Sequence, residues 1–170
     1  CFVQNLRNFE IVMVDDCSTD KTKEVMQTLA KEKPQIKLFY HDSNRGGGAA
    51  RNTAVQHAQS DFIFCLDGDD ILPKNVLSRM LTYIQEKKCD GVLFEETKFF
   101  SGSDTSKTES LKNTKLGEVV VFEDMFKKGL GFLAKVNFLY TKNAHTVAGG
   151  YPTHHGFDTQ AFGYRFLSKG

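Results

Sequence analysis

The sequence predicts an α/β protein whose mainly parallel sheet is flanked by helices, and two observations support this. Apolar runs typical of strands alternate along the chain with segments whose apolar residues recur at helical spacing. Two of these runs, 9–14 and 62–66, are nearly continuous, as expected for strands that are covered on both faces. Such alternation implies right-handed crossovers, which bring the carboxyl ends of parallel strands to one edge of the sheet.

The first half of the chain predicts strands and helices in alternation. A strand at 9–16 is followed by a helix that begins near Ser18, has a stripe of Val25, Met26 and Leu29, and stops before Pro34. A strand at 36–40 leads through a loop, 41–48, into a helix whose small residues are Ala50, Ala54 and Ala58. After the strand at 62–66, a helix follows Pro73 with an apolar side made of Val76, Leu77, Met80, Leu81 and Ile84.

The second half is less regular. We expect strands at 90–96, 119–122 and 132–140, a short helix at 123–128, a turn at 149–152 and a terminal helix at 158–168. The segment 101–115 is rich in Ser, Thr and Lys and lacks apolar periodicity, so we expect a mobile surface loop there, bounded at 98–118. Phe99 and Phe100 stand beside it and could contact a bound molecule.

The composition indicates one globular domain spanning 1–170. A chain of 170 residues with 40% hydrophobic residues can bury about two-thirds of its unfolded surface. Its net charge of +1 favours no class of partner, and we expect no nucleic acid. No apolar stretch approaches the roughly 18 residues of a membrane span, and no secretory pattern opens the chain. A cytoplasmic location is therefore expected.

The cysteines lack the paired spacing of metal ligands, and we expect free thiols at Cys1, Cys17, Cys65 and Cys89. Cys65 lies inside an apolar strand, where it can pack as a small hydrophobic residue. His57 is interpreted as a surface or packed imidazole.

Acidic residues follow two of the predicted strands. Asp15 and Asp16 end the first, and Asp67, Asp69 and Asp70 end the strand at 62–66. Carboxylates gathered at one sheet edge repel one another unless water solvates them or a divalent cation binds them. The alternative is a purely structural role in turns and helix caps.

A glycine loop lies between the two acidic strand ends. It runs from Asn44 through Gly46, Gly47 and Gly48 into a helix that carries Arg51. Backbone amides and a guanidinium suit a phosphate group, although Arg51 could also form a surface ion pair. Gly-x-x-x-x-Gly-Lys is absent, and Gly-x-Gly-x-x-Gly does not follow the first strand, which disfavours P-loop and dinucleotide sites. A nucleoside diphosphate bound through Mg²⁺ or Mn²⁺ fits best.

Three motifs together resemble the family 2 glycosyltransferases: 9–22, 44–52 with Ala50-Arg51-Asn52, and 64–70 with its Asp-x-Asp sequence. The resemblance implies a GT-A (Rossmann-like) fold and inverting transfer of a sugar from a nucleoside diphosphate donor. UDP-sugars are the favoured donors. Saccharides, including growing polysaccharides, and lipid-linked sugars are the acceptors, and peripheral contact with the inner face of the membrane is compatible with this.

The resemblance also assigns roles to residues. It places the donor's base and ribose near Asp15 and Asp16, and adds Asn44, Gly46, Arg51, Asp67 and Asp70 to the nucleotide-sugar site. The metal ligands would be Asp69 and Asp67, and Asp158 would be the catalytic base. Residues 1–97 then form the nucleotide-sugar half and 119–170 the acceptor half.

Some positions depart from the family pattern. Phe157 precedes Asp158 where the family usually has Glu, and Gln160 stands where a second acid is common. Asp158 could also serve only as a helix cap, and His154 or His155 could reach the metal. The family has a central strand and a helix ahead of the segment that resembles residue 1. We therefore expect a fragment, or another segment in that place, and weak donor binding.

Three different classes of protein also fit part of this pattern. A receiver domain would use Asp67 as its phosphoacceptor, but the loop 44–52 would then have no purpose. A catalytically inactive module that binds sugar nucleotides would keep the same motifs without turnover. A nucleotidyltransferase would share the sheet and the metal chemistry, but here the glycine loop follows the strand at 36–40 and not the first strand.

Overall fold

The computed structural model describes residues 4–68, 70, 72–93, 138–153 and 157–169. In chain order its elements are β1 (Ile11–Asp15), α1 (Thr22–Glu32), β2 (Ile36–Tyr40), α2 (Gly47–His57), β3 (Phe62–Phe64), α3 (Val76–Lys87), β4 (Gly91–Leu93), β5 (Phe138–Thr141), α5 (Lys142–Ala148) and α6 (Asp158–Lys169). No helix among these residues is long and apolar enough to cross a membrane.

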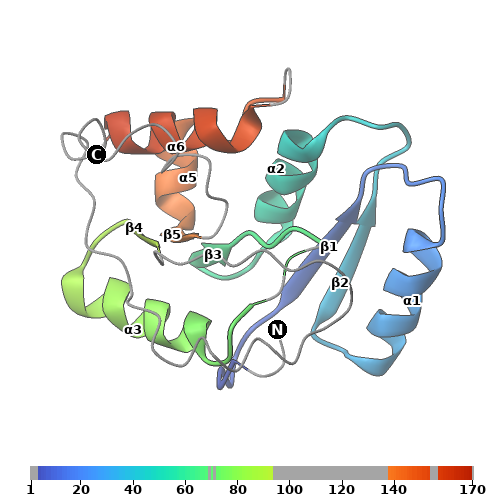
Figure 1. Ribbon diagram of the computed structural model, residues 1–170, viewed down its shortest axis with the longest axis horizontal. Helices are drawn as coiled ribbons and strands as arrows, with labels where there is room; N and C mark the ends of the chain where they lie inside the picture. Colours follow the sequence, from blue (N-terminus) through green and yellow to red (C-terminus); the bar gives the residue numbers. More distant parts are fainter. Residues whose placement is uncertain (1–3, 69, 71, 94–137, 154–156, 170) are drawn as a thin grey trace.

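The first sheet is the parallel pair that the sequence predicts. β1 and β2 are joined in register from Ile11 opposite Ile36 to Asp15 opposite Tyr40. The crossover helix α1 packs beside them (Figure 1). Of its expected apolar stripe only Met26 is buried, since Val25 is 55% and Leu29 38% exposed.

The second sheet differs from the expectation of mainly parallel strands. β5 lies between β3 and β4 and is antiparallel to both, so β3 and β4 run in the same direction without pairing. Apolar alternation along a strand does not indicate its direction, which is why the sequence pattern could not reveal this. In the part of the chain that the structure describes, β1 and β3 do not pair, and the sheet is interrupted between them.

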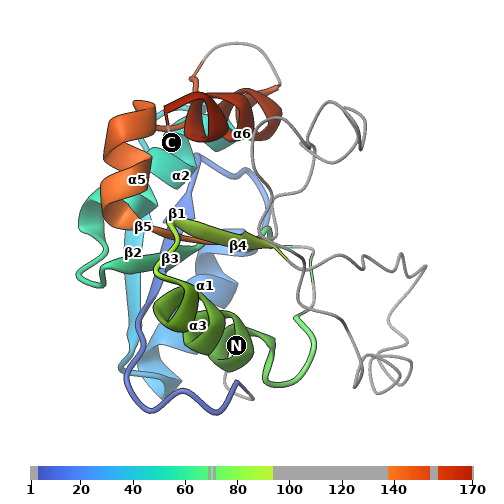
Figure 2. The ribbon, with the colours of Figure 1, turned by 90° about the vertical axis from the view of Figure 1, so that its left-hand side faces the viewer.

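Helices cover both faces of the second sheet. α3 packs on one face, while α2, α5 and α6 cover the other (Figures 1 and 2). Successive strand residues alternate between two cores, as a pleated strand requires. Ile63 and Tyr140 enter the cluster with Phe162 of α6, whereas Leu139 enters the cluster with Met80 of α3.

An acid just before β1 anchors the segment that follows α2. The Oε1 atom of Glu10 accepts hydrogen bonds from the amides of Gln59 (2.6 Å) and Ser60 (3.1 Å), and Oε2 pairs with Lys37 Nζ at 2.7 Å. Burial raises the pKa of Glu10, but these partners outweigh it and lower the pKa below its usual value. The segment between α2 and β3 is thus tied to the first sheet through Glu10 and Lys37.

Several sequence predictions can be compared directly with these elements. The strand at 36–40 and the helices after Pro73 and from residue 158 are confirmed. α5 has no counterpart among the expected elements, and the expected strands at 62–66, 90–96 and 132–140 are described only over shorter spans. The expected loop at 98–118, the strand at 119–122, the helix at 123–128, Phe99 and Phe100 lie outside the described residues. Cys17, Cys65 and Cys89 are free thiols as expected.

Candidate active site

Arg51 joins two acids that come from different elements. Its Nη2 atom donates to Asp67 Oδ1 at 2.6 Å, just beyond β3, and its Nη1 atom donates to Asp158 Oδ2 in the first turn of α6. The side chains of Arg51, Asp67 and Asp158 are 17%, 36% and 19% exposed. Arg51, Asp67 and the predicted base Asp158 thus form one cluster. In it the Arg51 guanidinium binds carboxylates. Arg51 thus forms ion pairs with two acids, but at 17% exposure it is not at the surface, where the alternative interpretation placed it.

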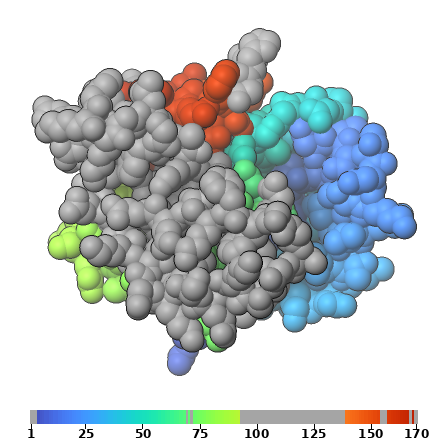
Figure 3. Space-filling model, viewed as in Figure 1, coloured from blue at the N-terminus to red at the C-terminus, as the bar shows by residue number. Residues whose placement is uncertain are grey.

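Two glycines let α2 approach the loop that leads into α6. A Cβ atom on Gly48 would lie 2.1 Å from the carbonyl oxygen of Pro152 and 3.0 Å from Cβ of Asp158. On Gly47 it would lie 2.9 Å from Arg51 Nη1. In the space-filling view, α2 and α6 adjoin (Figure 3). The sequence suggests a phosphate-binding role for these glycines, and the structure shows in addition that Gly48 is required for close packing against the Pro152 backbone.

Asn52 fixes the turn that precedes α6. Its Nδ2 atom donates to the carbonyl of Tyr151 at 2.7 Å, and its Oδ1 atom accepts from the Tyr151 amide at 2.8 Å. Gly149 and Gly150 adopt φ values of +80° and +70°, which favour glycine. The sequence points to Asn52 only as part of a motif. Its two hydrogen bonds to the backbone of Tyr151 make Asn52 a positioning residue for the segment that carries Asp158.

Asp16 holds the glycine loop. Its carboxylate accepts hydrogen bonds from the amides of Arg45 (2.9 Å) and Gly46 (2.7 Å) and contacts His41 Nδ1 at 2.6 Å. Asn44 Oδ1 accepts from the same Gly46 amide at 3.2 Å. Burial raises the pKa of Asp16, but the bonds from Arg45, His41 and Gly46 outweigh it and lower the pKa. Two amides of the expected phosphate loop are therefore directed at Asp16.

Asp15 occupies the carboxyl end of β1. It is only 5% exposed, and its Oδ1 atom accepts from the Ser18 amide at 3.3 Å. The chain turns sharply after it, because Cys17 adopts a positive φ of 64°. Asp15 and Asp67 thus both stand at the ends of strands, as predicted.

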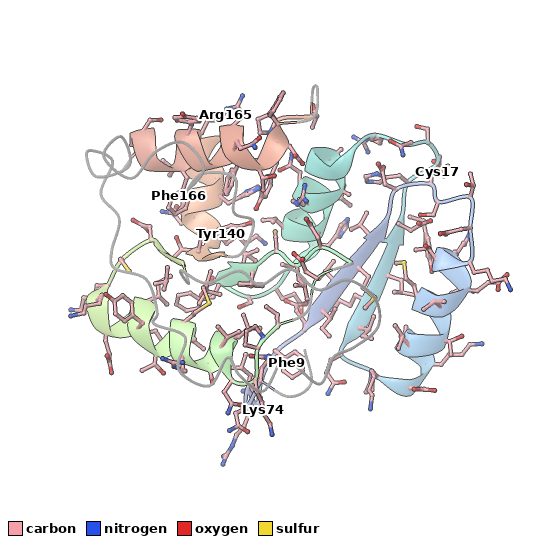
Figure 4. All side chains as sticks on the ribbon, viewed as in Figure 1. Phe9, Cys17, Lys74, Tyr140, Arg165 and Phe166 are labelled. Carbon is pink, nitrogen blue, oxygen red and sulfur yellow. The ribbon has the colours of Figure 1, made fainter. Side chains whose placement is uncertain are left out.

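A buried polar cluster lies behind Arg51. The hydroxyls of Tyr140 and Tyr151 are 3.2 Å apart, and both contact Cys65 Sγ, at 3.3 and 3.4 Å. Burial raises the pKa of the Cys65 thiol and of both tyrosines. Tyr140 also meets Phe166 of α6 edge-on, with ring centroids 6.1 Å apart (Figure 4). The Arg51 guanidinium carbon lies 5.8 Å from the centre of the Tyr151 ring, and Arg51 Nε is buried.

Asp69, His154 and His155 lie outside the described residues, so their expected metal contacts stay predictions. Asp70 is exposed, and its amide donates to the Asp67 carbonyl at 3.1 Å in the turn after β3. Within the described ranges no three His, Cys, Asp or Glu residues form a metal-binding group. The carboxylate oxygens of Asp67 are nevertheless the hard donors that Mg²⁺ and Mn²⁺ take. His57 stacks on Phe39 at 3.9 Å, as a packed imidazole.

The two oxygens of the Asp158 carboxylate have different contacts. Oδ2 meets Arg51, while the contact of Oδ1 in the described part of the chain is a long one from Thr159 Oγ1, at 3.4 Å. A carboxylate oriented in this way can accept a proton through Oδ1.

The chain is similar in sequence to known proteins. The chain is 31% identical over 139 residues to TuaG of Bacillus subtilis, whose name describes a candidate teichuronic acid biosynthesis glycosyltransferase. The match covers 74% of this chain and 54% of TuaG. It is also 35% identical over 88 residues to the poly(ribitol-phosphate) β-N-acetylglucosaminyltransferase TarS of Staphylococcus aureus, covering 51% of this chain and 15% of TarS. The chain thus spans only part of these relatives.

Solved structures show the same fold. The Staphylococcus aureus TarS structure in complex with UDP-GlcNAc has a TM-score of 0.74 and 20% identity, covering 97% of this chain and 46% of that one. The mannosyltransferase PcManGT of Pyrobaculum calidifontis, in complex with GDP-Man and Mn²⁺, has a TM-score of 0.66 and 18% identity, covering 97% and 45%. The fold is therefore GT-A.

The model of the family described as "Glycosyl transferase family 2" matches residues 1–152. Asp158 lies beyond that match, and its contact with Arg51 connects it to the matched residues. The chain belongs to glycosyltransferase family 2.

Proposed function

We propose that this protein transfers a sugar from a nucleoside diphosphate donor to an acceptor hydroxyl, with inversion at the anomeric carbon. The observation that carries the proposal is that Arg51 binds both Asp67 and Asp158, two acids that are 91 positions apart in the sequence. TarS and PcManGT, which share the fold, have been solved with UDP-GlcNAc and with GDP-Man and Mn²⁺. A UDP-sugar is the donor that we favour.

Asp158 acts as the general base. Its Oδ1 atom takes the proton of the acceptor hydroxyl, whose oxygen forms the new bond to the anomeric carbon as the bond to the diphosphate breaks. A single displacement needs one carboxylate on the acceptor side, unlike a retaining hydrolase with its close carboxylate pair. Arg51 orients Asp158 through Nη1, and Asn52 and the glycines of α2 fix the backbone around it.

Asp67 and Asp69 would hold the divalent cation, Mg²⁺ or Mn²⁺. When bound, it neutralises the charge that develops on the leaving diphosphate. Asp15, at the end of β1, would lie near the nucleoside. Asp16 contributes indirectly by holding the loop of Asn44 and Gly46.

Paired binding and turnover measurements test the proposal. Calorimetry with UDP-GlcNAc and MnCl₂ measures donor binding, and release of UDP in the presence of saccharide acceptors measures transfer. Asp158→Asn should lower transfer by about 10²–10⁴-fold while donor binding persists. Asp67→Asn should weaken the Mn²⁺-dependent binding of the donor. Asp61→Asn is the matched control, since Asp61 is exposed and precedes β3, whereas Asp67 follows it.

The outcomes distinguish an active transferase from the competing functions. Transfer at the wild-type rate by Asp158→Asn removes the base assignment. Donor binding without turnover by any variant or acceptor supports the inactive sugar-nucleotide-binding module. Stabilisation by acyl-phosphate analogues, with none by nucleoside diphosphates, supports the receiver domain.

A further inference from the structure

Phe157 stands beside the proposed base in an unusual environment. It is 70% exposed, the most exposed of the large hydrophobic side chains in the described residues. It directly precedes Asp158, the first residue of α6. Its carbonyl oxygen accepts a hydrogen bond from the amide of Ala161 at 2.9 Å, so Phe157 occupies the N-cap position of that helix. The helix therefore fixes the backbone from which the phenyl ring projects.

Stability does not explain a phenylalanine at this position. Helix N-caps favour Ser, Thr, Asp and Asn, whose side-chain oxygens accept from free amides of the first turn, and a phenyl ring cannot do this. The exposed ring also leaves apolar surface in water. A residue that departs from the N-cap preference directly beside the proposed base points to a functional constraint.

The chemistry of a phenyl ring limits what it can recognise. It offers an apolar face but has no group that can form a strong hydrogen bond with a phosphate or a hydroxyl. A pyranose has one face formed by C–H groups, which can lie flat on an aromatic ring while a ring hydroxyl reaches the neighbouring carboxylate. An acyclic polyol phosphate, such as the ribitol phosphate in the name of TarS, has no such face.

We propose that Phe157 is a stacking platform in the acceptor subsite and selects a pyranose acceptor over an acyclic polyol phosphate. The inference rests on the proposed role of Asp158 as the base, because the stacked ring would present its hydroxyl to that carboxylate. Phe157 is then a specificity-determining residue, which touches the acceptor and does not take part in proton transfer.

The absence of tryptophan from the chain permits a direct test. Phe157→Trp places a single fluorophore at the proposed platform and retains an aromatic face. The matched control is Val25→Trp on α1, where the native side chain is 55% exposed. Both variants are titrated with methyl β-galactopyranoside, methyl β-glucopyranoside and ribitol 5-phosphate, after circular dichroism has established that they are folded.

We expect a saturable change in emission from the tryptophan at position 157 with at least one pyranoside, little change with ribitol 5-phosphate, and none from the control. The inference is overturned if ribitol 5-phosphate gives the larger response, if the control responds equally, or if neither pyranoside causes a response.

Kinetics give a second, independent readout with the pyranoside that responds best. Phe157→Ala should raise the acceptor KM about tenfold relative to the donor KM, and Phe157→Tyr should restore it. Val25→Ala should change neither constant. Equal changes in the two KM values for Phe157→Ala would refute a platform for the acceptor.

The two proposals can fail separately. If UDP-GlcNAc and other nucleotide sugars do not bind in calorimetry but the tryptophan at position 157 responds to a pyranoside, the proposed function fails and the saccharide subsite stands. If transfer occurs without that response, the subsite fails and the proposed function stands.

Discussion

Replacing Arg51 tests whether its contacts hold the two halves of the site together. The guanidinium donates to Asp67 and Asp158, and each hydrogen bond to a charged group contributes about 1.5–3 kcal/mol. Asp67 is 36% exposed and therefore screened, whereas Asp158 is 19% exposed, so we place the combined loss near the lower bound. Arg51→Met should lower the free energy of unfolding by about 3 kcal/mol.

Arg51→Lys should cost about half as much, because one ammonium group cannot reproduce a forked contact with two carboxylates. Urea unfolding measures both values, and Arg79→Met on the exposed face of α3 is the control, expected within about 0.5 kcal/mol of wild type. A double-mutant cycle of Arg51→Met with Asp158→Asn should show coupling of about 1.5–3 kcal/mol. A loss below about 0.5 kcal/mol for Arg51→Met would refute the reasoning, since it would mean that water replaces both contacts at no cost.

Two further predictions concern the packing and anchoring of α2. Gly48→Ala should destabilise the fold by about 2–3 kcal/mol in urea unfolding, because its Cβ would lie 2.1 Å from the Pro152 carbonyl oxygen. The control is Gly68→Ala, which should be nearly neutral because nothing lies within 4 Å of a Cβ built there. Equal losses of stability in the two variants would contradict the prediction. Asp16 has a lowered pKa, so its stabilisation is present above its unfolded pKa of about 3.9 and is lost as pH falls through the folded value. Asp16→Asn should therefore destabilise by about 1–2 kcal/mol near neutral pH, with a difference that shrinks below about pH 4 in urea midpoints. A constant difference across that range would exclude the carboxylate as its source.

Local patterns are sufficient for much of the architecture. The strand at 36–40 agrees with β2 at both ends, and the buried residues Val76, Met80 and Ile84 of α3 follow helical spacing. The acids at the ends of β1 and β3 can also be placed, because a strand carries its last residues to the edge of the sheet. These features depend on residues that are close in the sequence, where periodicity is a direct record of geometry.

The partners of the site residues cannot be obtained in this way. The family resemblance places Asp16 at the donor, yet its carboxylate is occupied by loop amides and His41. The glycine loop suggests phosphate binding at Gly48, yet its missing side chain makes room for Pro152. Both contacts depend on which distant segment packs against the loop, and no local pattern contains that information.

The sequence by itself determined that acids, a glycine loop and Arg51 belong to one family motif set, and that the chain alternates strands with helices. Only the tertiary structure decided that β5 runs antiparallel between β3 and β4 and that Arg51 bridges Asp67 to Asp158. The reason is physical. Secondary structure follows from short-range periodicity, whereas an ion pair between residues separated by 107 positions exists only after α6 has packed against α2.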